Sequence, residues 1–332
     1  MKVMLIGGTG LISTAITQRL LKEGADVVHV NRGLTPPRYK GKVTEIVCDR
    51  YTPEFTRTLR EHGPYDVVID MCCYHKDQLW SAIEGVQGIT KQFIFCSTVD
   101  VYRKPAAVFP ITEDEALLGH TNYAQNKIAC EELVMTSARD GAFEATIIRP
   151  SCTYGEGGKV IHTFGWETWF LSRLEAGMPI VLCGDGTSMW SWCHVDDEAK
   201  AFAGACLNPA AYGQRYHAAS DELLTWNTSV AIIADAMGAP PPMIVHIPVK
   251  LLHQLVPEHS QISFDNFAWP NFYDNARAKK DLGFATTVPF SEGAKRTIDW
   301  IKANGGFQPA SADPVTDKVV AAWDKAKAAF LS

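Results

Sequence analysis

Tyr123 and Lys127 are the residues of this 332-residue chain whose types and spacing most directly suggest chemistry. Residues at positions i and i+4 of a helix lie on one face, so the phenol and the ammonium can point into one cleft. An ammonium near a phenol favours the phenolate and lowers the tyrosine pKa from its ordinary value of about 10. The pair can then exchange a proton with a substrate near neutral pH. The alternative is a solvated lysine beside a packed tyrosine.

A glycine-rich turn near the start of the chain supports the chemical interpretation. The apolar run at residues 2–6 leads into this turn, and a helical pattern follows up to Gly24. Glycines permit a tight turn in which backbone N–H groups approach a pyrophosphate at the start of a helix. The third position of the usual glycine pattern is Ser13. Strand, turn and helix together predict a dinucleotide site. The expected cofactor contacts in the turn are Gly7, Thr9, Gly10, Leu11 and Ile12.

The end of the second expected strand bears on the choice between NAD and NADP. Residues 26–30 lead into Asn31 and Arg32, at the place where an acidic residue would bind the ribose 2'-hydroxyl of NAD. Asn31 does not repel a 2'-phosphate, and Arg32, with Arg38 as a second candidate, can pair with one. NADP is therefore favoured, and NAD is the alternative.

Two further strand ends are expected to contribute cofactor contacts. Residues 43–48 deliver Asp49 and Arg50 to the same edge, where an aspartate can accept a hydrogen bond from the adenine amino group. A helix-capping or turn role is the alternative for Asp49. Residues 65–70 lead to Met71, which passes near the cofactor if the sheet is parallel.

The fifth expected strand, residues 92–96, ends at Ser97 and Thr98. Hydroxyls at the carboxyl end of a parallel strand lie where open α/β sheets place their ligands. A hydroxyl can both donate a hydrogen bond and accept one. Arg149-Pro150 closes a sixth expected strand.

In this order and spacing, the motifs resemble the extended short-chain dehydrogenase/reductases and, more narrowly, the NAD-dependent epimerase/dehydratase group. The glycine turn, Ser97-Thr98, Tyr123-x-x-x-Lys127 and Arg149-Pro150 carry the resemblance, and residues 184–197 and 273–300 extend it to essentially the whole chain. The Asn31-Arg32-Gly33 turn looks most like an atypical branch that includes the chloroplast stem-loop-binding proteins.

The resemblance implies a role for each residue of the site. Tyr123 would exchange a proton with a substrate carbinol while hydride moves to or from the nicotinamide. Lys127 would lower the tyrosine pKa and bind nicotinamide ribose hydroxyls. Thr98 would orient the substrate oxygen, with Ser97 as its alternative.

The resemblance also implies an α/β architecture: a doubly wound parallel Rossmann sheet with a smaller, discontinuous substrate-binding lobe. The expected NAD(P)-binding domain comprises residues 1–156 and about 191–220, and the expected lobe comprises about 157–190 and 221–332. A homodimer is implied as well.

Two positions depart from the pattern of the group. Trp190 stands where nucleotide-sugar members commonly carry an arginine for the substrate diphosphate, and Cys152 follows Arg149-Pro150 where asparagine is common. A tryptophan face suits stacking on a sugar better than it suits a phosphate. The departures favour a smaller or differently bound sugar-like substrate, with Cys152, Trp190 and Ser97 as candidate contacts. His194 is expected to be a hydrogen-bonded core residue.

Composition narrows the class of protein. Hydrophobic residues make up 46% and charged residues 20%, and the net charge of −6 makes nucleic acid an unlikely main partner. No run is long enough to span a membrane and the first residues do not form a leader, so a cytoplasmic protein is expected. The nine cysteines contain no C-x-x-C pair and no histidine cluster has metal-ligand spacing, so free thiols and no metal site are expected.

Two classes of function remain. The first is an enzyme that oxidises a sugar-like carbinol, in which the cofactor either returns the hydride, as in an epimerase or dehydratase, or leaves reduced, as in an NADP-dependent alcohol dehydrogenase or ketone reductase. The second is a protein that keeps the fold and binds RNA or another partner. Intact Thr98, Tyr123 and Lys127 favour the enzyme.

Overall fold

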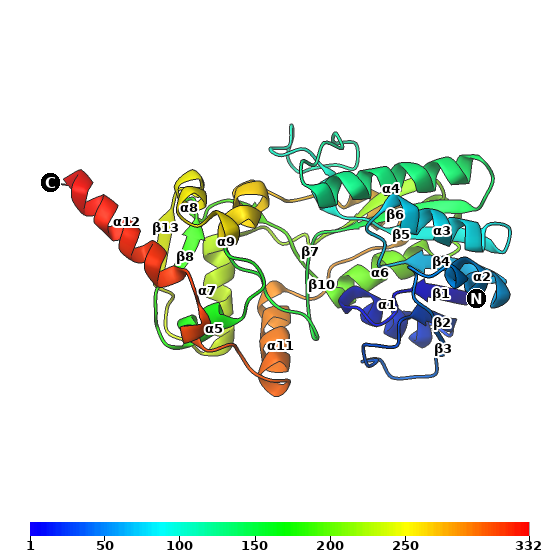
Figure 1. The fold of residues 1–332 in the computed structure, drawn as a ribbon, viewed down its shortest axis with the longest axis horizontal. Coiled ribbons are helices and arrows are strands. Elements are labelled where there is room, and N and C mark those ends of the chain that lie inside the picture. The colour runs from blue at the N-terminus through cyan, green and yellow to red at the C-terminus, as the bar shows by residue number, and fades with distance from the viewer. Residues whose placement is uncertain (332) are drawn as a thin grey trace. The chain divides into compact units, whose positions relative to one another are not determined.

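The computed structural model describes residues 1–331, which fold into two compact units (Figure 1). The first comprises Met1–Thr153, Val195–Asp221 and Tyr273–Thr287, and the second comprises Tyr154–His194, Glu222–Phe272 and the chain from Val288 onward. The expected division put residues 273–287 in the substrate lobe, whereas they pack in the first unit. No helix among the residues described is both long and apolar enough to cross a membrane.

A seven-stranded parallel sheet forms the centre of the first unit. Its strands are β1 (Lys2–Ile6), β2 (Asp26–Asn31), β3 (Thr44–Val47), β4 (Tyr65–Asp70), β5 (Thr90–Cys96), β6 (Glu144–Pro150) and β11 (Gln214–Ala218). Their order is β11-β6-β5-β4-β1-β2-β3, and every pairing is parallel. The order reverses between β1 and β4, as the doubly wound prediction requires, so that fold prediction is confirmed. All seven carboxyl ends share one edge, where ligands of such sheets bind.

Helices cover both faces of this sheet (Figure 1). One hydrophobic core lies between the sheet and α1 (Leu11–Lys22), α6 (Val195–Ala205) and α10 (Ala276–Leu282). The opposite core lies under α2 (Glu54–Glu61), α3 (Lys76–Val86) and α4 (Asn122–Arg139). Because strand side chains alternate between faces, β1 contributes Val3 and Leu5 to the first core and Met4 and Ile6 to the second. Two single-turn helices, η1 (Val99–Val101) and η2 (Pro209–Ala211), complete the unit.

The second unit is smaller and mainly helical. Its elements are α5 (Trp169–Glu175), β8 (Ile180–Cys183), β9 (Met189–Trp190), β10 (Trp192–His194), β12 (Leu224–Thr225), α7 (Trp226–Met237), β13 (Ile244–Ile247), α8 (Val249–Leu255), α9 (Pro257–Ile262), η3 (Ser263–Phe267), α11 (Phe290–Ala303), η4 (Ala310–Ala312) and α12 (Thr316–Leu331); β7 (Cys152–Tyr154) includes its first residue. β8 pairs with β13 and β9 with β12. Aromatic rings fill much of its interior.

Candidate active site

Helix α4 carries the tyrosine and the lysine, and its start is fixed by a cap. Thr121 is extended, and its hydroxyl accepts a hydrogen bond from the Ala124 N–H at 3.1 Å. Such a cap satisfies one of the N–H groups that a helix start leaves without a partner. Tyr123 therefore lies in the first turn of the helix and Lys127 one turn later on the same face, as predicted from their spacing.

Gly119 brings the approach to α4 close to the segment that follows β5. A side chain at this position would place its Cβ 2.2 Å from the Asp100 carbonyl oxygen, so only glycine fits. The Gly119 N–H also donates to the Val101 carbonyl at 2.9 Å. The loop before Tyr123 and the loop after Thr98 are thus held against each other by backbone contacts.

Thr98 and Tyr123 come together at the carboxyl end of β5. Thr98 caps η1, where its hydroxyl accepts from the Asp100 N–H at 3.2 Å, and that hydroxyl also hydrogen-bonds with the Tyr123 phenol. Two-fifths of the Tyr123 surface is exposed, yet partial burial of the phenol raises its pKa; Cys96 and Asp100 act in the same direction and Thr98 opposes them. The phenol is therefore protonated at neutral pH.

Lys127 is buried, with 3% of its surface exposed. Its ammonium donates to the Cys96 carbonyl at 2.8 Å and lies 5.9 Å from the centroid of the Tyr123 ring. The ammonium is directed at a strand carbonyl, and burial raises the Tyr123 pKa overall, so a lowering of that pKa by Lys127 stays a prediction. Among the residues described, no carboxylate pairs with it. A buried charge without a countercharge is costly and marks a candidate ligand contact.

Tyr74 lies in the segment after β4 that was expected to pass near the cofactor, but Met71 was the contact predicted there. The ring of Tyr74 lies 6.3 Å from the ring of Tyr123 and 5.3 Å from the Lys127 ammonium, and 48% of the Tyr74 surface is exposed. The available signal is its place four residues after β4, at the edge where strand ends gather ligands. Tyr74 belongs to the wall of the candidate site.

The glycine turn has the form that a dinucleotide requires. Gly7 has a φ of +88°, and a Cβ there would lie 2.7 Å from the Cys72 sulfur. A Cβ on Gly8 would lie 2.3 Å from the His29 ring. Helix α1 begins after Gly10, and its first turn contains no acidic residue. Its first N–H groups and the positive end of its dipole therefore fit a pyrophosphate.

Within this turn, Ser13 explains the altered glycine pattern. The Ser13 hydroxyl accepts a hydrogen bond from the Gly10 N–H at 2.8 Å, and this contact stabilises the turn. Leu11 and Ile12 lie half-buried in the first turn of α1 and pack against the core, with Thr9 half-buried just before the helix. The predicted turn residues are thus grouped where β1 passes into α1.

The end of β2 contains a carboxylate that sequence reasoning did not anticipate. Asn31 donates to Glu45 at 2.8 Å. In the parallel register Glu45 of β3 is opposite His29, two positions before Asn31, so the Glu45 carboxylate reaches along β2 to the Asn31 amide. Arg32 is exposed, and the Arg38 guanidinium reaches the Gly10 carbonyl at 3.5 Å. Arg32, Arg38 and the Glu45 carboxylate therefore lie near the end of β2. The available signal is the acidic residue within the neighbouring strand β3, opposite His29 and two positions from the partner of Asn31.

Arg50 is not a cofactor residue in this structure, which corrects the sequence-based assignment. It is buried, and its guanidinium donates two hydrogen bonds to the Asp70 carboxylate at 2.9 and 3.0 Å and a third to the Gln78 carbonyl at 2.8 Å. Burial lowers the pKa of Arg50, but the attraction of Asp70 outweighs it and raises the pKa overall. Arg50 therefore compensates a buried carboxylate at the end of β4.

Asp49 and Met71 occupy neighbouring strand ends. The Asp49 carboxylate accepts from the Tyr51 N–H at 3.1 Å, which is the turn role considered as the alternative. Met71 is half-buried, and its N–H donates to the Ile6 carbonyl at 3.0 Å. Met71 thus lies beside the end of β1, where the strand order reverses.

The three candidate substrate contacts have different surroundings. Ser97 is 3% exposed, and its hydroxyl has no hydrogen-bond partner among the described residues. Cys152 is half-buried at the start of β7. Trp190 is 6% exposed in the second unit, with the rings of Trp226 and Phe267 at 5.2 and 5.0 Å. Trp190 is therefore a core residue, and the proposed stacking platform is wrong for this structure.

His194 is 1% exposed, and its Nε2 lies 3.1 Å from the Glu156 carboxylate. The prediction of a core residue is confirmed by its burial, and Glu156 is its charged neighbour.

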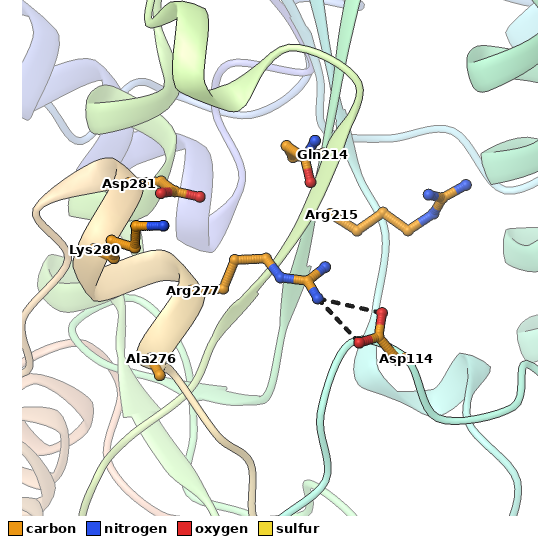
Figure 2. Close-up of a pocket in the computed structure, with 7 residues that line it drawn as sticks. All are labelled: Asp114, Gln214, Arg215, Ala276, Arg277, Lys280 and Asp281. Carbon is orange, nitrogen blue, oxygen red and sulfur yellow. Dashed lines mark hydrogen bonds and ion pairs between the residues drawn. The ribbon is translucent and has the colours of Figure 1, made fainter.

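A pocket of about 660 Å³ lies elsewhere on the first unit (Figure 2). Figure 2 shows the Arg277 side chain directed at Asp114, which it contacts at 3.2 Å. The remaining lining residues are Gln214, Arg215, Ala276, Lys280 and Asp281. Gln214 and Arg215 begin β11, so the pocket lies at the amino ends of the strands, away from the edge that binds ligands in such sheets. No predicted site residue lines it.

The chain is similar in sequence to a known family and to named proteins. Residues 3–219 match the sequence profile of the NAD dependent epimerase/dehydratase family. The chain is 27% identical to 2'-dehydrokanamycin reductase of Streptomyces kanamyceticus over 72% of this chain and 68% of the relative. It is 26% identical to the chloroplast stem-loop binding protein of 41 kDa b of Arabidopsis thaliana over 96% of this chain and 84% of the relative.

Solved structures share the fold. The epimerase Mth375 of Methanothermobacter thermautotrophicus superposes with a TM-score of 0.75 at 18% identity, covering 91% of this chain and 92% of that chain. A UDP-glucuronic acid 4-epimerase from Bacillus cereus, solved in complex with NAD, superposes with a TM-score of 0.72 at 18% identity, covering 92% and 99%.

Proposed function

This chain belongs to the NAD-dependent epimerase/dehydratase family, and we propose that it oxidises a carbinol of a sugar-like substrate by hydride transfer at a site formed by Thr98, Tyr123 and Lys127. One observation carries the proposal: a buried ammonium without a carboxylate partner lies beside a phenol and a capped threonine hydroxyl. Residues that only stabilised the fold would not need a buried ammonium without a carboxylate partner beside two hydroxyl groups. A nicotinamide ribose and a substrate oxygen would supply the missing partners.

The residues of the chain divide the work of the reaction. The Thr98 hydroxyl orients the substrate oxygen, and the Tyr123 phenol gives a proton to that oxygen or takes one from it. Lys127 offers its remaining N–H donors to the ribose hydroxyls. The start of α1 holds the pyrophosphate. When bound, the dinucleotide accepts or supplies the hydride at its nicotinamide ring.

The raised pKa of Tyr123 favours a second candidate, a ketone reductase with net redox. A phenol that is protonated at neutral pH is ready to donate to a carbonyl oxygen, which is the step that reduction requires. Oxidation requires the phenolate, and the positive charge of an oxidised nicotinamide lowers a neighbouring phenol pKa. The likeness to a named reductase over 72% of this chain points the same way.

NADP remains the favoured cofactor in this proposal, with NAD as the alternative. Arg32 is exposed, and Arg38 reaches over the turn to Gly10, so both can approach a 2'-phosphate. Glu45 opposes them, because its carboxylate beside Asn31 repels a phosphate and can accept from a 2'-hydroxyl. We therefore expect a modest preference, which titration of the protein with NADPH and NADH measures directly.

We further propose that the enzyme acts in the cytoplasm and forms a homodimer through the helices that flank Tyr123. Light scattering of the purified protein tests the assembly: a mass near 73 kDa, twice the 36.6 kDa chain, supports the dimer, and a monomer refutes it.

The test of function begins with mass spectrometry of nucleotides released from the denatured protein. The protein is then assayed with UDP-glucose and UDP-glucuronic acid for epimerisation, and with sugar ketones and NADPH for reduction. Tyr123→Phe should abolish any turnover. Tyr216→Phe, which removes the hydroxyl of a buried tyrosine on β11, is the matched control. A gel shift with structured RNA that survives Tyr123→Phe, in a protein that binds no dinucleotide, would refute the enzyme and favour a binding protein.

A further inference from the structure

Arg149 in β6 forms the centre of a buried polar cluster behind the candidate site. Its side chain has 0% exposure. Its Nε and Nη2 donate to the Glu131 carboxylate at 2.8 and 2.6 Å, and its Nη1 donates to the Tyr102 hydroxyl at 2.6 Å. Glu131 and Tyr102 are each 1% exposed. We call these three residues the Arg149 clamp.

The two partners of Arg149 belong to the two segments that carry the candidate catalytic groups. Glu131 lies on α4, four residues after Lys127 and eight after Tyr123, so the three side chains share one side of the helix. Tyr102 directly follows η1, the helical turn that Thr98 caps. One guanidinium therefore connects the helix of the phenol to the segment of the threonine hydroxyl.

The hydrogen bonds of the clamp have a defined direction. His217 faces the Asp274 carbonyl through Nδ1 at 2.9 Å, so this nitrogen carries the proton and Nε2 is an acceptor. The Tyr102 hydroxyl, 2.6 Å from Nε2, must then donate to His217 and accept from Arg149. Burial lowers the pKa of His217 to about 3, so the ring stays neutral and this arrangement holds at physiological pH.

We propose that Glu131, Arg149 and Tyr102 are positioning residues, which set the separation of the Thr98 hydroxyl and the Tyr123 phenol. The inference rests on the proposed function. A guanidinium is planar and its donors form a rigid fork, so it fixes the angle as well as the distance between two partners. A buried ion pair contributes little net stability compared with apolar residues of the same volume. Stability alone is therefore a weak reason for this cluster.

Neighbouring charges belong to the same cluster. Arg215 lies 3.8 Å from the Glu131 carboxylate. Glu113 accepts from the His217 N–H at 3.3 Å and lies 3.7 Å from Arg277, and its backbone carbonyl accepts from Arg149 at 3.3 Å. Arg215 and Arg277 line the pocket of Figure 2. None of these contacts reaches α4 and the segment after Thr98 together. Arg149 therefore adds a buried side-chain link to the backbone contact that Gly119 makes between the two segments.

Tyr102→Phe is the sharpest test, because it removes one oxygen and keeps the ring. The matched control is Tyr216→Phe, which removes the hydroxyl of an equally buried tyrosine. That hydroxyl lies 2.9 Å from the Ala210 carbonyl and 3.1 Å from the Asp281 carboxylate, outside the clamp. Arg149→Lys is a second variant that keeps the charge and loses the fork. Two readouts are compared: turnover of the UDP-sugar and ketone substrates with NAD or NADPH, and amide hydrogen exchange of the intact protein.

If the clamp positions the site, Tyr102→Phe lowers kcat by about tenfold to a hundredfold, which is the cost of a displacement near 1 Å. KM changes by less than about threefold, because substrate binding is not the lost interaction. Amide exchange rises in both segments, residues 97–104 and 121–131. Tyr216→Phe leaves kcat and both segments unchanged.

The proposal is overturned if Tyr102→Phe keeps kcat within about twofold of the Tyr216→Phe control, or if exchange rises at residue 102 without reaching 121–131. A loss of kcat that simply follows loss of folded protein also overturns it, and Arg149→Lys checks this with a second perturbation. A wild-type protein that turns over no substrate refutes the proposed function instead. Amide exchange in the two segments then still decides whether the clamp links them.

Discussion

Arg50→Met separates a structural arginine from a cofactor-binding one. Asp70 has 0% exposure, and Arg50 pairs with it through two hydrogen bonds. Removing one partner of such a pair leaves a buried charge without compensation, which costs about 3–5 kcal/mol. At roughly 2–4 °C per kcal/mol for a unit of this size, the melting temperature should fall by about 6–20 °C. Dinucleotide affinity should change by less than about twofold, because the guanidinium faces Asp70.

Chemical denaturation at pH 7 measures the stability of Arg50→Met, and fluorescence titration with NADPH and NADH measures affinity. Arg32→Met is the matched control, because this arginine is exposed at the same edge of the sheet. It should leave the unfolding free energy within about 0.5 kcal/mol of wild type and weaken NADPH binding. The double variant Arg50→Met/Asp70→Asn should recover part of the lost stability, since the uncompensated charge is gone.

The reasoning would be refuted if Arg50→Met weakened dinucleotide binding about tenfold or more and left the unfolding free energy within about 1 kcal/mol of wild type. That result would mean that the Asp70 pair breaks when the dinucleotide binds and that Arg50 serves the ligand. Equal losses of stability in the single and double variants would show that the cost arises from packing around Arg50, with no contribution from the charge of Asp70.

Three further predictions follow from other contacts. Glu45→Gln should shift the ratio of NADPH to NADH affinity toward NADPH by about tenfold, as measured by titration, because it removes the carboxylate at the end of β2; an unchanged ratio would place the ribose elsewhere. Because the Tyr123 pKa is raised, the rate of oxidation should still rise with pH beyond pH 9, and reduction should persist there. Stopped-flow rates measured across pH test this, and a rate of reduction that is already lost as the pH is raised to 8 would contradict it. His162 and His217 are buried, and their pKa values are lowered to about 3, so the unfolded state binds more protons below pH 6.5. As the pH is lowered from 6.5 to 3, the unfolding free energy should fall by about 1.4 kcal/mol per pH unit for each histidine, and an unfolding free energy that stays constant over this range would exclude this.

The parts of the fold that depend on local pattern could be predicted from the sequence. The glycine turn, the helix start before Tyr123 and the threonine at a strand end each follow from residue types within a few positions. The Thr121 cap and the φ of +88° at Gly7 are local requirements of that kind. The doubly wound order was implied by the family resemblance, and strands that alternate with helices agree with it.

Partners of charged residues could not be predicted in this way. Arg50 and Asp70 are 20 positions apart, and Asn31 and Glu45 are 14 apart, so their contacts depend on strand order and register. One signal was present: Asp70 ends a buried strand, and a buried carboxylate requires a cation or several donors. The buried position of Trp190 could not be predicted either. Its neighbours Trp226 and Phe267 come from distant segments, which spacing along the chain does not reveal.

The position of Lys127 shows what the i, i+4 spacing can predict and what it cannot. That pattern correctly places two side chains on one face of a helix, but a lysine has a long, flexible side chain, and its direction depends on the nearest unsatisfied acceptor. Here the acceptor is the Cys96 carbonyl, and the ammonium lies 5.9 Å from the centroid of the Tyr123 ring. The phenol therefore keeps its proton until another positive charge approaches it. In the proposed enzyme, such a site would couple the protonation of Tyr123 to the charge of the nicotinamide, so the same residues would serve reduction and oxidation without changing position.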